Sequence, residues 1–413
     1  MRVKADGEFV RRQNRLLLVE ALRRHGPQAR TELGRKTGLS PATVTSITGD
    51  LLAEGLLTGH GDESTARSGP GRPLQRLTLN GLAASVLGIE ISIDTVSFIF
   101  ASYDGRIIDR RVRREPTQRV TAAAFGKRLS ADVRTVLRRN KAMAGPVQRI
   151  GVSVQGIANS ARGTIAWSPA FRARDIAIVA PLESALGVET SISNDTNLAA
   201  QALLRRHPEA YSGTAAVVFI GYGVGMGLII DGSVYAGPNG AAAEFGHMNH
   251  LPDGPLCRCG QRGCVEAFAS DYGIYRAASG QAPASEPPHA AIAPSAMAAI
   301  EARARAGDPL AKAAFREAGL ALGYGLARAI ALVELERVAL MGSGLTAFDL
   351  LEPALRHGLA RGLPVGLQRD VPIEVEPSNN NLMTDGLLDS LLGDIDRRRS
   401  ARVNGPALQG GAV

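Results

Sequence analysis

The chain has 413 residues, 45% of them hydrophobic, and a formal net charge of +8. This length and apolar content predict a folded protein of two or three domains and argue against a disordered chain. No apolar run approaches the roughly 20 residues that a membrane-spanning helix needs. The first residues place charges on both sides of a short apolar stretch and lack a small-residue cleavage site, so we expect a cytoplasmic protein.

Positive charge is concentrated at the N-terminus. Residues 1–80 contain 13 Lys and Arg against 8 Asp and Glu, a surplus of +5, which leaves only +3 for the longer remainder. A local basic surplus is the electrostatic signature of a module that binds nucleic-acid phosphates. We therefore expect a DNA-binding domain in this region.

Three helices are predicted there, the last two joined by a glycine turn. The first, residues 14–25, has apolar residues at helical spacing and stops at a Gly-Pro step. The second starts near Thr31 and ends at the Gly38-Leu39 turn, after which Ser40 is the predicted N-cap of the third helix, with Pro41 at its first position. This arrangement matches the helix-turn-helix pattern.

The third helix is predicted to present small hydroxyls on its outer face, opposite an inward apolar stripe. The residues that we expect to contact DNA from this helix and its cap are Ser40, Thr43, Thr45, Ser46 and Thr48. Side chains of this kind can reach base edges or phosphates in the major groove.

Two strands around a polar loop are predicted next. Segments 56–60 and 74–80 alternate apolar and polar residues on either side of the loop GDESTARSGPGRP, which completes a winged helix-turn-helix. Arg67 and Arg72 would lie on the wing, and Gly71-Arg72-Pro73 resembles the minor-groove-reading step of AT-hook peptides. The expected partner is a double-stranded DNA operator; a helical bundle with a solvated basic face and a protein-binding adaptor are the alternatives.

From about Val86 the composition changes to glycine-rich, β-branched segments that alternate with helical stretches. Strands are predicted within 86–105, 149–160, 215–237 and 337–345, and the alternation indicates an α/β fold. Several of these strands end in glycine turns. Ligands of α/β sheets bind beside such strand ends, where glycine lets the backbone approach a phosphate or a sugar.

All three cysteines lie within eight residues, behind a histidine, in the segment EFGHMNHLPDGPLCRCGQRGC. Three thiols cannot close into an even disulfide framework, and their spacing fits thiolates held by a metal in a reducing compartment. Sulfur and imidazole ligands suit a tetrahedral Zn²⁺, and four protein ligands leave no position for water, as in a structural site. The alternative is three incidental buried thiols beside a surface histidine.

Three segments resemble, in order and spacing, the signature blocks of the ROK family of sugar kinases and sugar-responsive repressors. They are SNDTNLAAQALL (193–204), GYGVGMGLIIDGSVYAGPNGAAAEFGHM (221–248) and CRCGQRGCVEAFAS (257–270). Together with the winged helix, the likeness covers nearly the whole chain. It implies a two-lobed, actin-like ATPase (ribonuclease H-like) α/β fold of the sugar-kinase type, with a sugar in the cleft.

The resemblance also assigns residues to the pocket and to the metal. The ligands that it implies for a structural Zn²⁺ are His247, Cys257, Cys259 and Cys264. The sugar-binding residues that it implies are Asn194, Asp195, Glu244, His247 and Glu266. Carboxylates and an amide suit a polyol because each buried hydroxyl needs a hydrogen-bond partner. Asp195 matches the general base of the kinases, and Ala170 stands where a sugar-binding asparagine is usual.

The first phosphate loop distinguishes a kinase from a sensor. The kinases usually have an acidic residue, a variable residue and Gly-Gly-Thr there, whereas this chain has Glu90-Ile91-Ser92-Ile93-Asp94. Branched side chains and a carboxylate oppose a polyphosphate by bulk and by charge. We therefore expect a transcriptional repressor of carbohydrate genes without kinase activity, controlled by a sugar or a sugar phosphate. The alternatives are an active sugar kinase with a DNA-binding domain, and a scaffold whose metal serves only stability.

The expected organisation has four parts. They are a winged helix domain at 1–80, a first lobe at 86–200, a second lobe with the metal site at 201–395, whose last helix is free to return to the first lobe, and a flexible tail at 396–413. Because repressors of the family are usually oligomers, we expect a homodimer or homotetramer. Closure of the cleft would then alter the spacing of two DNA-binding heads.

Overall fold

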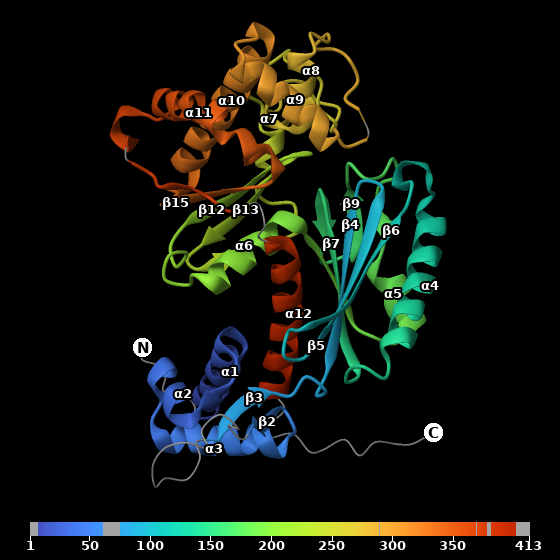
Figure 1. Cartoon of the computed structure of the whole chain (residues 1–413), viewed down its shortest axis with the longest axis vertical. Coiled ribbons are helices and arrows are strands. Elements are labelled where there is room, and N and C mark those ends of the chain that lie inside the picture. The colour runs from blue at the N-terminus through green and yellow to red at the C-terminus, as the bar shows by residue number, and fades with distance from the viewer. Residues whose placement is uncertain (1–6, 61–74, 289, 369, 378–380, 402–413) are drawn as a thin grey trace.

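The computed structural model consists of three bodies connected by one long final helix (Figure 1). It describes residues 7–60, 75–288, 290–368, 370–377 and 381–401. The N-terminal unit lies at the bottom of Figure 1, one α/β lobe stands to its upper right, and the other lies at the top. Among the helices of the described residues, none is long and apolar enough to cross a membrane.

The N-terminal unit is a winged helix. Its elements are α1 (Gly7–His25), β1 (Gln28–Ala29), α2 (Arg30–Thr37), α3 (Pro41–Ala53), β2 (Leu57–His60) and β3 (Arg76–Leu79), with an antiparallel sheet in the order β1-β3-β2. Ser40 caps α3, because its Oγ accepts a hydrogen bond from the Thr43 backbone N–H (3.2 Å), and Pro41 follows at the first helical position. The predicted helix-turn-helix is confirmed. α1 starts well before residue 14, and β1 is too short for its sequence to show alternation.

The first lobe is built on a five-stranded sheet in the order β11-β7-β4-β5-β6. Its strands are β4 (Ser85–Ser92), β5 (Thr95–Ser102), β6 (Ile107–Arg114), β7 (Val147–Val154) and β11 (Thr190–Asn194), of which β4, β7 and β11 are parallel. Helices α4 (Ala122–Asn140) and α5 (Val179–Leu186) pack on one face of this sheet (Figure 1). The short strands β8 (Ile157–Asn159), β9 (Thr164–Trp167) and β10 (Ile176–Ala177) form a separate small sheet.

The second lobe repeats the same topology. Its sheet has the order β14-β13-β12-β15-β16 and consists of β12 (Ala215–Ile220), β13 (Val224–Ile230), β14 (Ser233–Val234), β15 (Arg337–Met341) and β16 (Ile373–Val375). Its helices are α7 (Val265–Ala269), α8 (Asp271–Ala278), α9 (Pro294–Arg305), α10 (Pro309–Val333) and α11 (Phe348–Gly362). In both lobes three antiparallel strands lead into two parallel ones. The expected two-lobed α/β fold is therefore confirmed.

Two helices, α6 (Asp195–Arg206) and α12 (Leu382–Ala401), lie between the bodies (Figure 1). α12 contacts α6, the strands β4 and β7, and α1 of the winged helix. Gly386 allows the close approach to α6, because a Cβ at this position would lie 1.8 Å from the carbonyl oxygen of Leu198. Leucines of α12 share one apolar core with α1, α2 and α3. The winged helix is therefore packed against the rest of the molecule.

The sequence predicts a tail from residue 396 onward, which is too early, because residues 396–401 still belong to a helix. α12 continues to Ala401, and Asp396 and Ser400 are buried. Three consecutive arginines at 397–399 suggest a solvated terminus. Asp396, just before them, is nevertheless buried in an ion pair with Arg23, which lies near the other end of the chain. A contact between residues so far apart leaves no local pattern in the sequence.

Candidate functional site

A cavity, called here the first cavity, is lined by both lobes. The side chains that line it from the first lobe and the start of α6 are Gln155, Trp167, Pro169, Asn194, Asp195 and Thr196. Those from the second lobe are Phe219, Tyr222, Val224, Met226, Ala242, Ala243, Glu244, His247, Arg258 and Glu266. All five residues predicted to bind sugar thus lie around one cavity. Ala170 is fully buried and is not among the lining residues.

Asn194 and Asp195 are positioned by the start of α6. The Asn194 Oδ1 accepts hydrogen bonds from the backbone N–H groups of Thr196 (2.9 Å) and Asn197 (3.1 Å), so Asn194 is the N-cap and Asp195 the first helical residue. The Asn194 Nδ2 donates to the Gly156 carbonyl oxygen (2.8 Å). Asn194 is therefore a structural cap that also borders the cavity.

Asp195 is a buried carboxylate held at both oxygens. Its Oδ1 accepts a hydrogen bond from the Thr196 backbone N–H (2.8 Å), and its Oδ2 accepts one from the Tyr222 hydroxyl (2.7 Å). Burial raises the pKa of Asp195 to about 6, while these hydrogen bonds oppose the shift. At neutral pH Asp195 is thus mostly ionised, but it titrates within two units of neutrality.

Two glutamates complete the acidic side of the cavity. The Glu266 Oε2 accepts a hydrogen bond from the Val224 backbone N–H (3.1 Å), and its Oε1 accepts one from the Tyr272 hydroxyl (3.2 Å). The Glu244 Oε2 lies 3.7 Å from the His247 Nε2, and burial raises the pKa of Glu244 above its ordinary value. The cavity therefore presents three carboxylates that can accept hydrogen bonds from a polar ligand.

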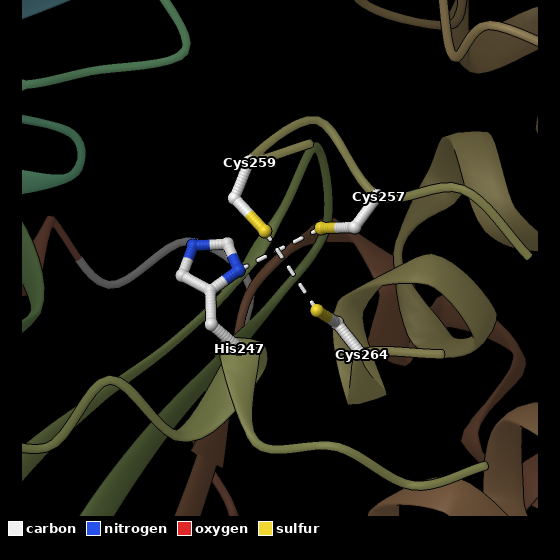
Figure 2. Close-up of side chains that lie close together, drawn as sticks. All are labelled: His247, Cys257, Cys259 and Cys264. Carbon is white, nitrogen blue, oxygen red and sulfur yellow. Dashed lines mark hydrogen bonds between the residues drawn. The ribbon is translucent and has the colours of Figure 1, made fainter. Parts of the chain in front are cut away.

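Figure 2 shows His247, Cys257, Cys259 and Cys264 converging on one point. Their ligand atoms all lie within 4.8 Å of one another. The Cys257 Sγ is 3.6 Å from the His247 Nδ1, and the Cys259 Sγ is 3.7 Å from the Cys264 Sγ. Metal–sulfur bonds of about 2.3 Å in a tetrahedron place sulfurs about 3.8 Å apart. The four side chains therefore fit a tetrahedral metal ion, and all three cysteines are free thiols.

The local fold explains how these ligands converge. Gly263 has φ +72°, and a Cβ there would lie 1.7 Å from the Leu251 carbonyl oxygen, so the turn before Cys264 requires glycine. Cys264 is the N-cap residue of α7, and Glu266 is in the first turn of that helix. Hydrogen bonds from Cys257 and Cys264 lower the pKa of the Cys259 thiol, which favours the thiolate that a metal binds. A bound ion would fix both α7 and the Glu266 that it carries.

The residues predicted to contact DNA do not all share one face. Ser40, Thr45 and Ser46 are exposed and Thr43 is partly exposed. Thr48 is fully buried: its hydroxyl donates to the Val44 carbonyl oxygen (2.7 Å) and accepts from the Arg30 Nε (2.9 Å). The predicted outward position of Thr48 is wrong, because one turn of α3 places it beside Val44 on the inner side. Arg67 and Arg72 lie outside the described residues.

Three residues around the cavity are not singled out by the sequence patterns. Trp167 packs edge-on against His247, with 5.3 Å between ring centroids, and it is the single tryptophan of the chain. Tyr222 lies inside a glycine-rich turn that the sequence does show, but its bond to Asp195 depends on tertiary contact. The Arg258 guanidinium stacks on Tyr272 at 4.4 Å from the ring centroid. Its position between Cys257 and Cys259 is the only local signal for it.

A second cavity of about 490 Å³ adjoins the first. Its lining residues include Glu90, Ile91, Ser92, Arg110, Ser153, Met341, Gly342, Ser343, Thr346, Asn381, Leu382, Met383 and Thr384. It shares Asp195, Phe219 and Tyr222 with the first cavity. The predicted loop at 90–94 thus reaches this cavity with its first three residues.

Comparison with known proteins identifies relatives across most of the chain. The model of the ROK family matches residues 86–381. The xylose repressor of Bacillus spizizenii is 29% identical over 283 residues, which cover 66% of this chain and 69% of the repressor. A glucokinase of Streptomyces coelicolor is 31% identical over 232 residues, which cover 54% of this chain and 73% of the glucokinase. A ROK family transcriptional regulator, described as a homolog of the E. coli MLC protein, has a crystal structure that matches with a TM-score of 0.73 and 22% identity, covering 95% of this chain and 98% of the regulator.

Proposed function

We propose that this chain, which belongs to the ROK family, is a DNA-binding transcriptional regulator, most simply a repressor, with a sugar effector in the first cavity. The observation that carries the proposal is the winged helix packed through α12 onto the two-lobed body. The similarity to a xylose repressor, and the fold shared with a ROK regulator over 95% of the chain, support it.

α12 supplies a physical connection between the cavities and the winged helix. At its start, Leu382 and Met383 line the second cavity, and the Thr384 hydroxyl donates to the Glu90 carboxylate. Near its end, the Arg23 Nη2 donates to the Asp396 Oδ2 (2.8 Å). A ligand that changes how the lobes approach each other would move α12 and with it α1. Such a ligand alters operator affinity only as far as it favours one of the two arrangements.

For DNA, α3 is the element that we propose enters the major groove. Thr43, Thr45 and Ser46 would reach bases or phosphates, and Ser40 would contribute through its place at the helix N-terminus. Arg67 and Arg72 remain predicted wing contacts. A homodimer or homotetramer would present two winged helices to two half-sites of a double-stranded operator.

For the metal centre, we propose Zn²⁺ held by His247, Cys257, Cys259 and Cys264. When bound, the ion supplies structural cross-linking without an open coordination position. The buried Tyr272 hydroxyl contacts the Cys257 Sγ (3.5 Å) as well as Glu266, so the surroundings of the metal ligands and the first cavity share a residue. The metal would thereby keep Glu244, Glu266 and His247 at the cavity.

An active sugar kinase is the competing function, and the glucokinase similarity gives it weight. Against it, the described residues that line the second cavity supply the Glu90 and Asp195 carboxylates and one cation, Arg110, whose Nη2 lies 3.6 Å from the Glu90 Oε2. Ile91 and Ser92 replace the bare glycine backbone that a polyphosphate would need. We therefore propose that phosphoryl transfer has been lost.

The test selects operators from random double-stranded DNA with the purified full chain and then adds a panel of sugars. We expect recovery of a defined sequence, a change in its affinity with at least one sugar, and no ATP consumption with any. Glu244→Ala should abolish the sugar response while operator binding persists, whereas Glu317→Ala, at a partly exposed glutamate on α10, should change neither. Recovery of no sequence, or sugar-dependent ATP turnover, would overturn the proposal.

A further inference from the structure

The wall between the two cavities is made by residues that both cavities share. Tyr222 lies in the turn between β12 and β13, and its hydroxyl donates to the Asp195 Oδ2 (2.7 Å). The Phe219 ring packs against the Tyr222 ring, with 4.7 Å between the centroids. A substituent that extends from a ligand in the first cavity past Asp195 therefore meets these two rings.

The first cavity is rich in hydrogen-bond acceptors. Asp195, Glu244 and Glu266 contribute carboxylates. The Gln155 side chain is 6% exposed, and its Oε1 is buried without a hydrogen-bond partner within the described residues. Such an acceptor can take a hydrogen bond from a ligand hydroxyl. Sugar hydroxyls can donate, whereas a phosphate dianion has no proton to give.

Among the described residues that line this cavity, the two that can carry a positive charge are Arg258 and His247, and both already have partners. The Arg258 Nη1 donates to the Tyr222 carbonyl oxygen (2.6 Å), and its Nε and Nη2 donate to the Pro288 carbonyl oxygen (3.2 and 2.9 Å). His247 belongs to the metal-ligating cluster, where three thiolates and a Zn²⁺ would sum to a charge of about −1. Among the described residues that line the cavity, a phosphate would thus face three carboxylates and a single arginine, Arg258, whose guanidinium is held in place by backbone carbonyls.

We propose that the effector is a neutral, unphosphorylated sugar and that Tyr222 is a specificity-determining residue that closes the cavity to a phosphate ester. The inference rests on the proposed sugar-binding function of the first cavity. The three carboxylates disfavour a phosphate group by charge, and the Tyr222 and Phe219 rings stand between the first and the second cavity. Tyr222 also holds Asp195 in the orientation that accepts a sugar hydroxyl.

The test is isothermal titration of the full chain with D-glucose, D-xylose and N-acetyl-D-glucosamine, and with glucose 6-phosphate, xylose 5-phosphate and N-acetylglucosamine 6-phosphate. We expect at least one neutral sugar to bind at least about tenfold more tightly than its phosphate ester. Tyr222→Ser, which removes the ring, should reduce this ratio. Tyr222→Phe keeps the ring and should keep the ratio while weakening the neutral sugar, because Asp195 loses its partner.

The ratio of the two affinities reports selection, whereas a loss of folding would lower both affinities together. Equal or tighter binding of a phosphate ester by the wild type would overturn this inference and leave the proposed sugar function standing. An unchanged ratio in Tyr222→Ser would remove Tyr222 as the selecting residue. Failure of all six compounds to bind would overturn the sugar pocket itself, and this inference with it.

Discussion

Asp396→Asn tests whether the winged helix is rigidly coupled to α12. Asp396 and Arg23 form an ion pair whose side chains are only 7% and 6% exposed, and the Tyr103 hydroxyl donates to the second Asp396 oxygen (2.6 Å). Asparagine keeps the shape and can still accept from Tyr103, but it removes the carboxylate that pairs directly with the buried Arg23 guanidinium, which is left with the electrostatic attraction of Asp389. Breaking one side of a buried pair costs about 3–5 kcal/mol.

The lower end of that range applies here. The Arg23 guanidinium still donates to the Tyr103 carbonyl oxygen, and it lies 5.0 Å from the centroid of the Tyr103 ring, so part of its stabilisation survives. We expect the free energy of unfolding to fall by about 3 kcal/mol, measured by urea denaturation followed by circular dichroism. The ratio of operator affinities with and without sugar should move toward one.

The matched control is Asp349→Asn, the same chemical change in an exposed pair. Asp349 accepts from the Arg305 Nη2 (3.0 Å), and both side chains are about half exposed, so no measurable loss of stability is expected. If Asp396→Asn were as stable as this control, the buried pair would not hold α1 to α12. If Asp396→Asn were less stable but kept its sugar response, α12 would not be the element that transmits the sugar signal to the winged helix.

Three further predictions test the metal, the cavity and the DNA-binding face. Cys259→Ser should lose bound zinc and lower the melting temperature, and equal zinc content in mutant and wild type, measured by plasma mass spectrometry, would contradict the assignment. Because the pKa of Asp195 is about 6, its carboxylate is lost as the pH falls, and the affinity for a neutral sugar should drop about tenfold from pH 7 to pH 5. The fluorescence of Trp167, which lines the cavity, would report sugar binding at each pH. Asp195→Asn should make the sugar affinity independent of pH over this range, and a pH-independent affinity in the wild type would refute the role of Asp195. Thr48→Ala should lower the free energy of unfolding by about 1 kcal/mol without removing a DNA contact. Thr45→Ala should weaken operator binding without changing stability. The reverse outcome would contradict the orientation of α3.

The sequence allows the metal cluster and the helix-turn-helix to be predicted because both are local. Cys257, Cys259 and Cys264 are close in the chain, so their spacing alone indicates converging ligands. Ser40 and Pro41 mark the start of α3 through capping rules that act within a few residues. The alternation of strands and helices predicts an α/β fold, but it does not predict the three antiparallel strands that begin each sheet or the repeat of one topology in both lobes.

Tertiary contact determines what the sequence does not reveal. Threonine is a residue type usually found at the surface. Thr48 is nevertheless buried, because its hydroxyl donates a hydrogen bond to the Val44 carbonyl oxygen and accepts one from Arg30. Asp396 lies next to three arginines, yet it pairs with Arg23 from the opposite end of the chain. Asp396 is buried because a partner distant in the chain meets its hydrogen bonds, and no local periodicity encodes such a partner. Thr48 lies four residues after Val44, so helical periodicity places it on the inner face, and only its bond from Arg30 depends on tertiary contact.

Two helices, α6 and α7, begin at the edge of the first cavity and lead away from it. α6 starts with Asp195, and one turn later Leu198 contacts Gly386 of α12. α7 starts beside the metal ligand Cys264 and carries Glu266. A ligand that bridges Asp195 and Glu266 would therefore act on α7, which a bound metal would fix, and on α6, which packs against α12. A metal bound by Cys264 and its neighbours would anchor α7, so the response would pass through α6 to α12 and the winged helix.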